Sequence, residues 1–245
     1  MTTVTTQNPV RSDLASLETG AADRATSSSR LWAVAGIGSA LLGAATIVTS
    51  SVSGYVYQDK YSHGSIDGIA GDLSDNAGIL FAFHSITALG AVLMVVFAAG
   101  LFRRLRATAT AASLAPVVAL VGLAGTAVVS IMGSGLDTEF MMPAGQSSQS
   151  VDDGSAAIYG HWVGTIPWLW TLVGLAGLAV FALSRSRAVP RWLGIVGLLL
   201  GGLTVLLGVS PLEYMSGVFG VLWLLVTAVG FAVGDRSFRG AHRAG

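Results

Sequence analysis

The chain has 245 residues, of which 53% are hydrophobic and only 11% are charged, and its formal net charge is zero. Charged residues make up about a quarter of an ordinary soluble domain, so this composition excludes that class and favours a membrane protein. There is no cysteine, which excludes disulfides, thiolate metal sites and cysteine nucleophiles. The balanced charge gives no indication of nucleic-acid binding.

Residues 1–30 are rich in Thr, Ser and Ala and contain no apolar run. Such a segment buries too little surface to offset its chain entropy, so we expect a disordered tail. The tail also lacks the hydrophobic stretch of a secretory signal peptide.

Six apolar runs follow, each about 20 residues long, which is enough to cross a hydrocarbon core of about 30 Å as a helix. They cover residues 31–53, 78–102, 112–134, 156–184, 192–210 and 212–233. The sequence therefore predicts an all-α polytopic bundle of six transmembrane helices over residues 31–233. A short basic tail is expected at residues 234–245.

The basic residues are segregated along the chain. Of the 13, all except Lys60 fall in the tails or in the second and fourth loops: Arg11, Arg24, Arg30, Arg103, Arg104, Arg106, Arg185, Arg187, Arg191, Arg236, Arg239 and Arg243. The positive-inside rule then predicts that both termini lie in the cytoplasm and that loops one, three and five lie outside. Together with the richness in Ala, Gly and Val, the preference for arginine favours the plasma membrane of a bacterium.

The expected outer loops are acidic. They contain Asp59, Asp67, Asp72, Asp75, Asp137, Glu139, Asp152 and Asp153, and Glu213 falls at the last outer turn. A solvated acidic face is the simplest interpretation, since the run from Asp67 to Asp75 lacks the alternating ligand spacing of a calcium loop.

Aromatic residues support the register of the spans. Trp32 and Trp192 fall at the cytoplasmic starts of the first and fifth spans, and Tyr159 and Trp162 at the outer start of the fourth. We expect all four side chains in the interfacial aromatic belts.

Small residues and prolines predict local features of the packing. Ser39 with Gly43, and Gly197 with Gly201, are spaced four apart as in close helix contacts. Pro116 and Pro167 are expected to kink the third and fourth spans, and Pro167 to open a local cavity.

Three ionisable side chains are candidate functional residues because such groups are costly at membrane depth. His84, His161 and Glu213 lie about 28, 36 and 33 Å above the inner boundary, on the three helices that run inward. Two imidazoles and a carboxylate at similar depth are a candidate facial site for zinc or iron, with Asp137 as an alternative third ligand.

Each candidate also has a structural explanation. Ser210-Pro211-Leu212-Glu213 has the pattern of a capping box, which would make Glu213 a helix cap. His161 has the neighbours of an interfacial ring, and His84 those of a buried side chain bonded to a neighbouring helix. A haem between His84 and His161 is a further alternative, although the chain offers no second histidine pair near the inner face.

The fourth loop, Arg187-Ala188-Val189-Pro190-Arg191-Trp192-Leu193-Gly194, and the turn from Gly100 to Arg106 resemble a pattern in uncharacterised six-helix bacterial integral membrane proteins grouped as a domain of unknown function. The resemblance covers about residues 31–233. It implies the same six-span topology and no particular activity.

No motif supports an enzyme: the chain contains neither a nucleophile elbow, nor a phosphate-binding loop, nor a zinc-protease helix. We therefore expect a non-enzymatic scaffold, sensor or accessory subunit. The alternatives are a metal- or haem-binding protein using His84 and His161, and a small-solute carrier. The sequence names no cofactor, and the expected partners are the lipid bilayer and either another protein or a second copy of the chain, not nucleic acid.

Overall fold

A computed structural model describes residues 30–62, 67–144, 151–161 and 163–241, and this part of the chain is helical and contains no strand. The chain divides into two units, Met1–Leu31 and Trp32–Gly245, and apart from Leu31 the helices belong to the second unit. The tail predicted over residues 1–30 lies outside the described residues, except for Arg30.

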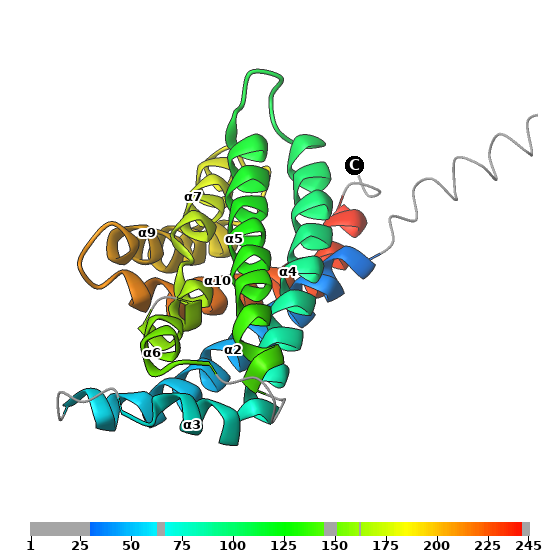
Figure 1. Cartoon of the computed structure of the whole chain (residues 1–245). Coiled ribbons are helices and arrows are strands. Elements are labelled where there is room, and N and C mark those ends of the chain that lie inside the picture. Colours follow the sequence, from blue (N-terminus) through cyan, green and yellow to red (C-terminus); the bar gives the residue numbers. More distant parts are fainter. Residues whose placement is uncertain (1–29, 63–66, 145–150, 162, 242–245) are drawn as a thin grey trace, which may run out of the picture. The chain divides into compact units, whose positions relative to one another are not determined.

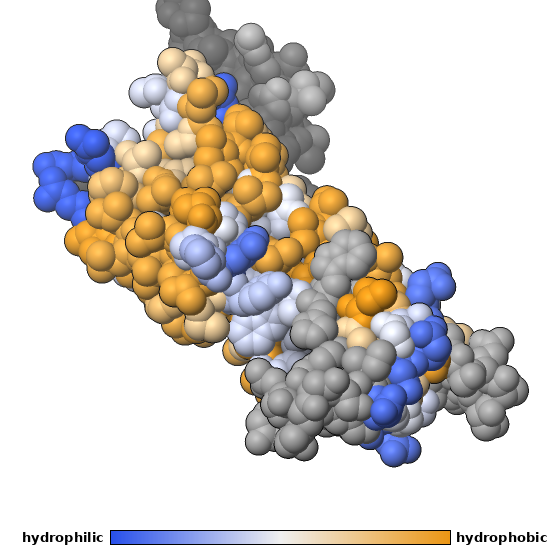
Figure 2. All heavy atoms as spheres, turned by 60° about the vertical axis from the view of Figure 1, so that its left-hand side comes forward, coloured by the Kyte–Doolittle hydropathy of each residue, from blue (hydrophilic) through white to orange (hydrophobic). Residues whose placement is uncertain are grey.

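Six segments of the described chain are long and apolar enough to cross a membrane. They are Leu31–Val52, Ala77–Arg106, Ala115–Met142, Asp153–Arg185, Arg191–Gly208 and Glu213–Val233. Hydrophobic residues cover most of the face shown in Figure 2, and hydrophilic residues gather mainly toward its ends. The prediction of an all-α fold with six apolar spans is confirmed.

The first three spans are continuous helices: α2 (Leu31–Ser62), α4 (Ala77–Arg106) and α5 (Ala115–Ala144). The short helix α3 (Ile69–Asp75) precedes α4. Helices α4 and α5 lie side by side, joined by the turn at residues 107–114 (Figure 1).

Two of these helices extend into regions predicted as outer loops. Helix α2 continues to Ser62, and α5 continues to Ala144, so Asp137 and Glu139 lie in a helix. The reason is that no proline interrupts α5 between its first turn and Pro143, and each further residue adds a backbone hydrogen bond.

The fourth span is broken near its middle, as predicted. It consists of α6 (Asp153–His161), a 3₁₀ helix η1 (Val163–Trp168) and α7 (Thr171–Arg185). Pro167 lies in η1, where its missing N–H interrupts the α-helical ladder. The kink predicted at Pro116 is wrong, because this proline is in the first turn of α5, where its N–H would have no helical partner.

The last two spans are also irregular at one point each. The fifth consists of α8 (Arg191–Val196), a π-helical turn η2 (Gly197–Gly201) and α9 (Gly202–Gly208). The sixth begins with a 3₁₀ turn η3 (Glu213–Met215) and continues as α10 (Ser216–Ala241). Residues 234–241, expected in the basic tail, therefore continue the last helix.

The two ends of the bundle differ in charge. Arg103, Arg104 and Arg106 end α4, Arg185 ends α7, and Arg191 begins α8. We call this the arginine end. The opposite end, where α4 begins and α5 finishes, carries the short helices α3 and α6 and is called the α3–α6 end (Figure 1).

Aromatic packing differs from the predicted interfacial belts at two positions. Trp32 is 8% exposed, with its ring 5.7 Å from that of Phe97 and 5.6 Å from that of Phe231. Tyr159 is also buried. Trp192 is 50% exposed, as an interfacial ring requires. Trp162 lies outside the described residues. Trp32 and Tyr159 are buried because neighbouring helices cover them.

Glycines allow a close helix contact between α7 and η2. A Cβ atom added at Gly177 would lie 2.8 Å from the Cα atom of Gly201, and one at Gly197 would lie 2.4 Å from the carbonyl oxygen of Gly177. The predicted contact role of Gly197 and Gly201 is confirmed. In membranes such backbone proximity replaces the hydrophobic driving force.

The second predicted small-residue pair, Ser39 and Gly43, lies where α2 meets α4 and the fourth span. The Ser39 hydroxyl donates to the carbonyl of Gly90 at 2.9 Å. A Cβ atom at Gly43 would lie 2.9 Å from the ring of Trp170. The prediction is confirmed for this pair as well.

We expect Gly177→Ala to destabilise the bundle by about 1–3 kcal/mol, because the new methyl group meets backbone atoms of η2 that cannot move aside. Thermal unfolding in detergent measures the change. Gly78→Ala in α4 is the control, since nothing lies within 4 Å of its added Cβ. Equal stabilities of the two variants would contradict the packing.

Candidate functional site

The most unusual polar group in the described chain is the carboxyl group of Asp137, which is 0% exposed although α5 is a membrane-spanning segment. Removing a carboxyl group from water is costly unless other groups bond to it. The groups that contact its two oxygens are therefore the first evidence on the role of this carboxyl group. Asp137 lies near the α3–α6 end, about two turns before α5 finishes.

One oxygen of this carboxyl group is bonded to the outer helix α6. The hydroxyl of Tyr159 donates to Asp137 Oδ1 at 2.5 Å. Tyr159 is 2% exposed, and its ring centroid lies 4.9 Å from that of Phe140 on α5. The bond thus attaches α6 to the membrane-spanning helix α5 at a point closed to solvent.

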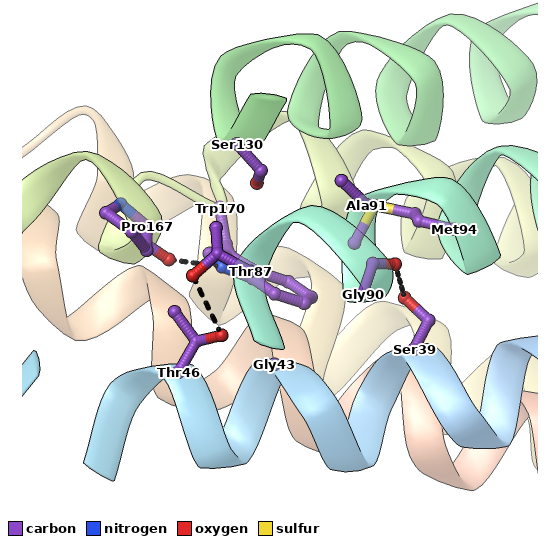
Figure 3. A pocket seen from close by; sticks show the side chains of 10 residues that line it. All are labelled: Ser39, Gly43, Thr46, Thr87, Gly90, Ala91, Met94, Ser130, Pro167 and Trp170. Carbon is purple, nitrogen blue, oxygen red and sulfur yellow. Dashed lines mark hydrogen bonds between the residues drawn. The ribbon is translucent and has the colours of Figure 1, made fainter. Parts of the chain in front are cut away.

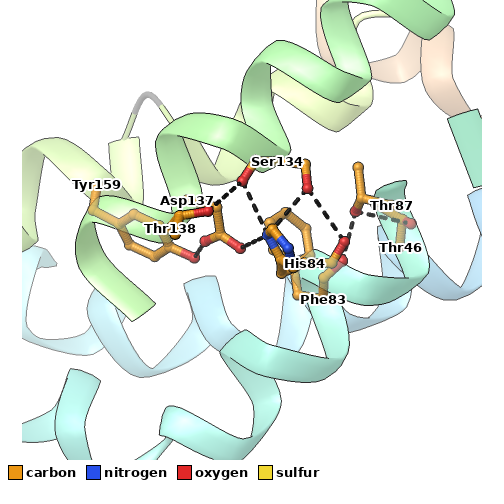
Figure 4. Close-up of polar contacts among 8 residues, drawn as sticks. All are labelled: Thr46, Phe83, His84, Thr87, Ser134, Asp137, Thr138 and Tyr159. Atoms are coloured by element: carbon orange, nitrogen blue, oxygen red, sulfur yellow. Dashed lines mark hydrogen bonds and ion pairs between the residues drawn. The ribbon is translucent and has the colours of Figure 1, made fainter. Parts of the chain in front are cut away.

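The second oxygen faces helix α4. Asp137 Oδ2 lies 3.7 Å from His84 Nδ1, too far for a hydrogen bond but close enough for an ion pair when the imidazole is charged. No described group donates a hydrogen bond to Oδ2. The carboxyl group is therefore only half satisfied by its neighbours (Figure 4).

Contacts with Ser134 determine the hydrogen position on His84. Nδ1 lies 3.0 Å from the carbonyl oxygen of Ser134 and 3.1 Å from its hydroxyl oxygen. A carbonyl can only accept, so Nδ1 carries the hydrogen and Nε2 is the acceptor of the neutral ring. The His84 side chain is 28% exposed. Because Nδ1 already carries a hydrogen, a proton that the ring gains goes to Nε2.

An apolar cluster holds α6 in place. Tyr159 and Ala156 of α6 pack with Leu73 of α3, Leu80 of α4 and Met141 of α5. We call His84, Ser134, Asp137 and Tyr159 the Asp137 cluster. The apolar cluster lies beside it and places α3 and α6, which we call the α3–α6 layer, in contact with α4 and α5.

Two aspartates fix the N-termini of the short helices. The Asp153 carboxylate accepts from the backbone N–H groups of Gly68 and Ala70, at 3.1 and 2.9 Å, and so joins α6 to the start of α3. The Asp152 carboxylate accepts from the N–H and the hydroxyl of Ser155. These hydrogen bonds hold the pKa of Asp152 below its usual value.

Polar contacts continue from the cluster toward the middle of the bundle. The Thr87 hydroxyl donates to the carbonyl of Phe83 at 2.7 Å, and its oxygen lies 3.2 Å from that of Thr46 on α2. Both threonines line a small pocket, with room for about one water molecule, that Ser130 and Trp170 also border (Figure 3). Ser39 of α2, which donates to the carbonyl of Gly90, also lines this pocket, and the buried residues of α4 beyond Gly90 are all apolar.

The predicted site residues that the structure describes lie in different surroundings. His84 contacts Asp137, which the sequence offered as an alternative third ligand. Glu213 is exposed in η3, and the predicted capping box does not form: the Ser210 oxygen accepts from the N–H of Leu212 instead of Glu213, and the N-cap of η3 is Leu212. The His161 side chain lies outside the described residues. No group of three His, Asp or Glu side chains in the described chain is arranged to hold a metal ion.

Sequence reasoning missed the contact between Asp137 and Tyr159. It placed Asp137 in a solvated loop because this residue follows the end of the third apolar run, and Tyr159 at an interface because it lies at the start of the fourth. The available signal was the spacing of Ser134 and Asp137, which are three apart and so share one face of a helix.

The fold and the cluster together define a multi-pass α-helical membrane protein with a buried ionisable cluster near one end. Comparison with protein families, curated proteins and solved structures gives no match to this chain. The resemblance to six-helix bacterial membrane proteins stays a prediction.

We expect Tyr159→Phe to destabilise the protein by about 1–3 kcal/mol, because Asp137 Oδ1 then remains buried without its donor. Denaturant-induced unfolding in detergent measures the loss. Tyr214→Phe is the matched control, since Tyr214 is 47% exposed. Equal losses in the two variants would show that the hydroxyl of Tyr159 makes no special contribution.

Proposed function

We propose that this protein is a non-enzymatic membrane sensor, in which the Asp137 cluster receives a stimulus and the α3–α6 layer transmits it. The observation that carries the proposal is the buried carboxyl group of Asp137, shared between His84 of a spanning helix and Tyr159 of an outer helix. Ionisable groups at membrane depth are costly, and they mark functional sites in most membrane proteins.

The layer is suited to transmission because the cluster provides one of its polar attachments. Helix α6 has nine residues and α3 has seven, too short for either to be stable alone. Their positions depend on the apolar cluster, on the Asp153 bonds to α3, and on the bond from Tyr159 to Asp137. A change at Asp137 therefore alters how firmly α6 is held.

The limited extent of the polar contacts that start at Asp137 favours a sensor over a small-solute carrier. From Asp137 and His84 the contacts reach Thr46 and Thr87, and the buried face of α4 then continues with Met94, Phe97 and Leu101. A coupled carrier needs polar groups along a route to both sides of the membrane. The contacts that start at Asp137 and His84 are described as far as the Thr46–Thr87 pair, near the middle of the bundle (Figure 4).

The arginine end supports an orientation for this sensor. With the arginines of α4, α7 and α8 in the cytoplasm, both termini are cytoplasmic and the α3–α6 layer faces the outside. The preference for arginine over lysine and the richness in Ala, Gly and Val support the plasma membrane of a bacterium as the location. The stimulus then comes from the outer aqueous phase, and the partner that receives the signal is a membrane protein or a second copy of this chain.

Hydrogen exchange of α3 and α6 tests the proposal in the full chain reconstituted into lipid nanodiscs. Exchange is compared across a series of pH values, divalent cations and small solutes. We expect at least one condition to change the exchange of α6 in the wild type, and Asp137→Asn to abolish that response. Glu139→Gln is the matched control, because Glu139 is an exposed carboxylate two residues further along α5.

Several outcomes would contradict the proposal. No response under any condition, or equal responses in wild type and Asp137→Asn, would remove the sensing role. Stoichiometric metal or haem lost in both His84→Ala and His161→Ala would establish the metal alternative instead. Solute flux through the wild type would establish a carrier.

A further inference from the structure

We infer that the stimulus is the proton of the outer aqueous phase, bound by His84 and Asp137 as a pair that takes up one proton. This inference rests on the proposed sensing role and names its ligand. The binding step is simple: His84 Nε2 accepts one proton from a hydronium ion of the outer aqueous phase. An N–H bond forms, one O–H bond of the hydronium breaks and leaves water, and the imidazole becomes an imidazolium ion.

The geometry of His84 favours a proton at Nε2. The carbonyl of Ser134 already requires the hydrogen on Nδ1, so an added proton must go to the other nitrogen. The ring then carries a positive charge with Nδ1 3.7 Å from Asp137 Oδ2, the oxygen that no described donor satisfies. The proton therefore places a positive charge beside the carboxylate oxygen that lacks a described donor.

Among the side chains that the structure describes, the surrounding groups leave this pair as the site of the charge change; the side chain of His161 on α6 lies outside them. Tyr159 of α6 is the other ionisable side chain bonded to Asp137, and its phenol is neutral at ordinary pH. On α6, Asp153 is engaged by backbone N–H groups of α3. Glu139 of α5 and Asp75 of α3 are exposed, Asp72 of α3 is half-buried, and η1 contains no ionisable residue.

The number of protons on the pair determines its charge. With one proton, the pair is neutral overall, either as an ion pair or as a neutral histidine beside a carboxylic acid. Without it, Asp137 carries a negative charge that is sealed from solvent and has only the Tyr159 hydroxyl as donor. Burial of such a charge is costly, and opening of α6 lets water reach the carboxylate.

The direction of the response follows from this difference. Below the pH at which the pair titrates, the proton is bound, the cluster is neutral and α6 is held closed. As the pH rises through that value the proton is lost, and the closed position of α6 loses stability. Acidification of the outer phase thus closes the α3–α6 layer, and alkalinity loosens it.

Hydrogen exchange of the full chain in nanodiscs between about pH 5 and pH 8 tests the inference, after correction for the intrinsic pH dependence of amide exchange. We expect the protection of α6 to fall by about five- to 150-fold as the pH rises. Both His84→Gln and Asp137→Asn should abolish the pH dependence, the first by removing the proton acceptor and the second by removing the charge. Glu139→Gln should keep it.

Proton uptake is followed separately through the ¹³C signal of the His84 ring in histidine-labelled protein. Retention of the pH dependence of α6 in His84→Gln would overturn the inference. A wild type that ignores pH but responds to a cation or a solute through Asp137 would also overturn it and leave the sensing role intact. Titration of the His84 signal without any response of α6 would overturn both.

Discussion

The buried carboxyl group of Asp137 is the constraint on which the α3–α6 end of this molecule depends. A carboxyl group with no exposure in a membrane-spanning helix must be compensated by its neighbours. Here a phenol from α6 and an imidazole from α4 approach its two oxygens. The helices that carry these groups are therefore fixed relative to α5 by polar contacts as well as by apolar packing.

The remainder of the bundle is held differently. The last three spans approach each other through glycines, and the backbones of α7 and η2 meet at Gly177, Gly197 and Gly201. Lipid is as apolar as the side chains, so close van der Waals contact supplies the attraction that burial supplies in water. The glycine contacts pack the last three spans closely, whereas we propose that the Asp137 cluster forms an end that responds to its surroundings.

Sequence patterns predicted the spans because each apolar run must form a helix in lipid, and the break at Pro167 because proline cannot donate a hydrogen bond. The patterns failed where contacts between residues far apart in the chain determine whether a side chain is buried. Asp137 is buried rather than solvated because His84 and Tyr159, which are 53 and 22 residues away in the chain, compensate its burial. Trp32 is buried for a similar reason, since Phe97 and Phe231 cover it. No local pattern contains these pairings.

A double-mutant cycle between Asp137 and Tyr159 tests the central claim most directly. The free energy of unfolding is measured in detergent at about pH 8 for the wild type, Asp137→Asn, Tyr159→Phe and the double variant. If the bond holds α6 on α5, the coupling energy is about 1.5–3 kcal/mol, as for a hydrogen bond to a charged group. Additive effects, with a coupling energy near zero, would contradict the account, because Asp137 would then be buried without depending on α6.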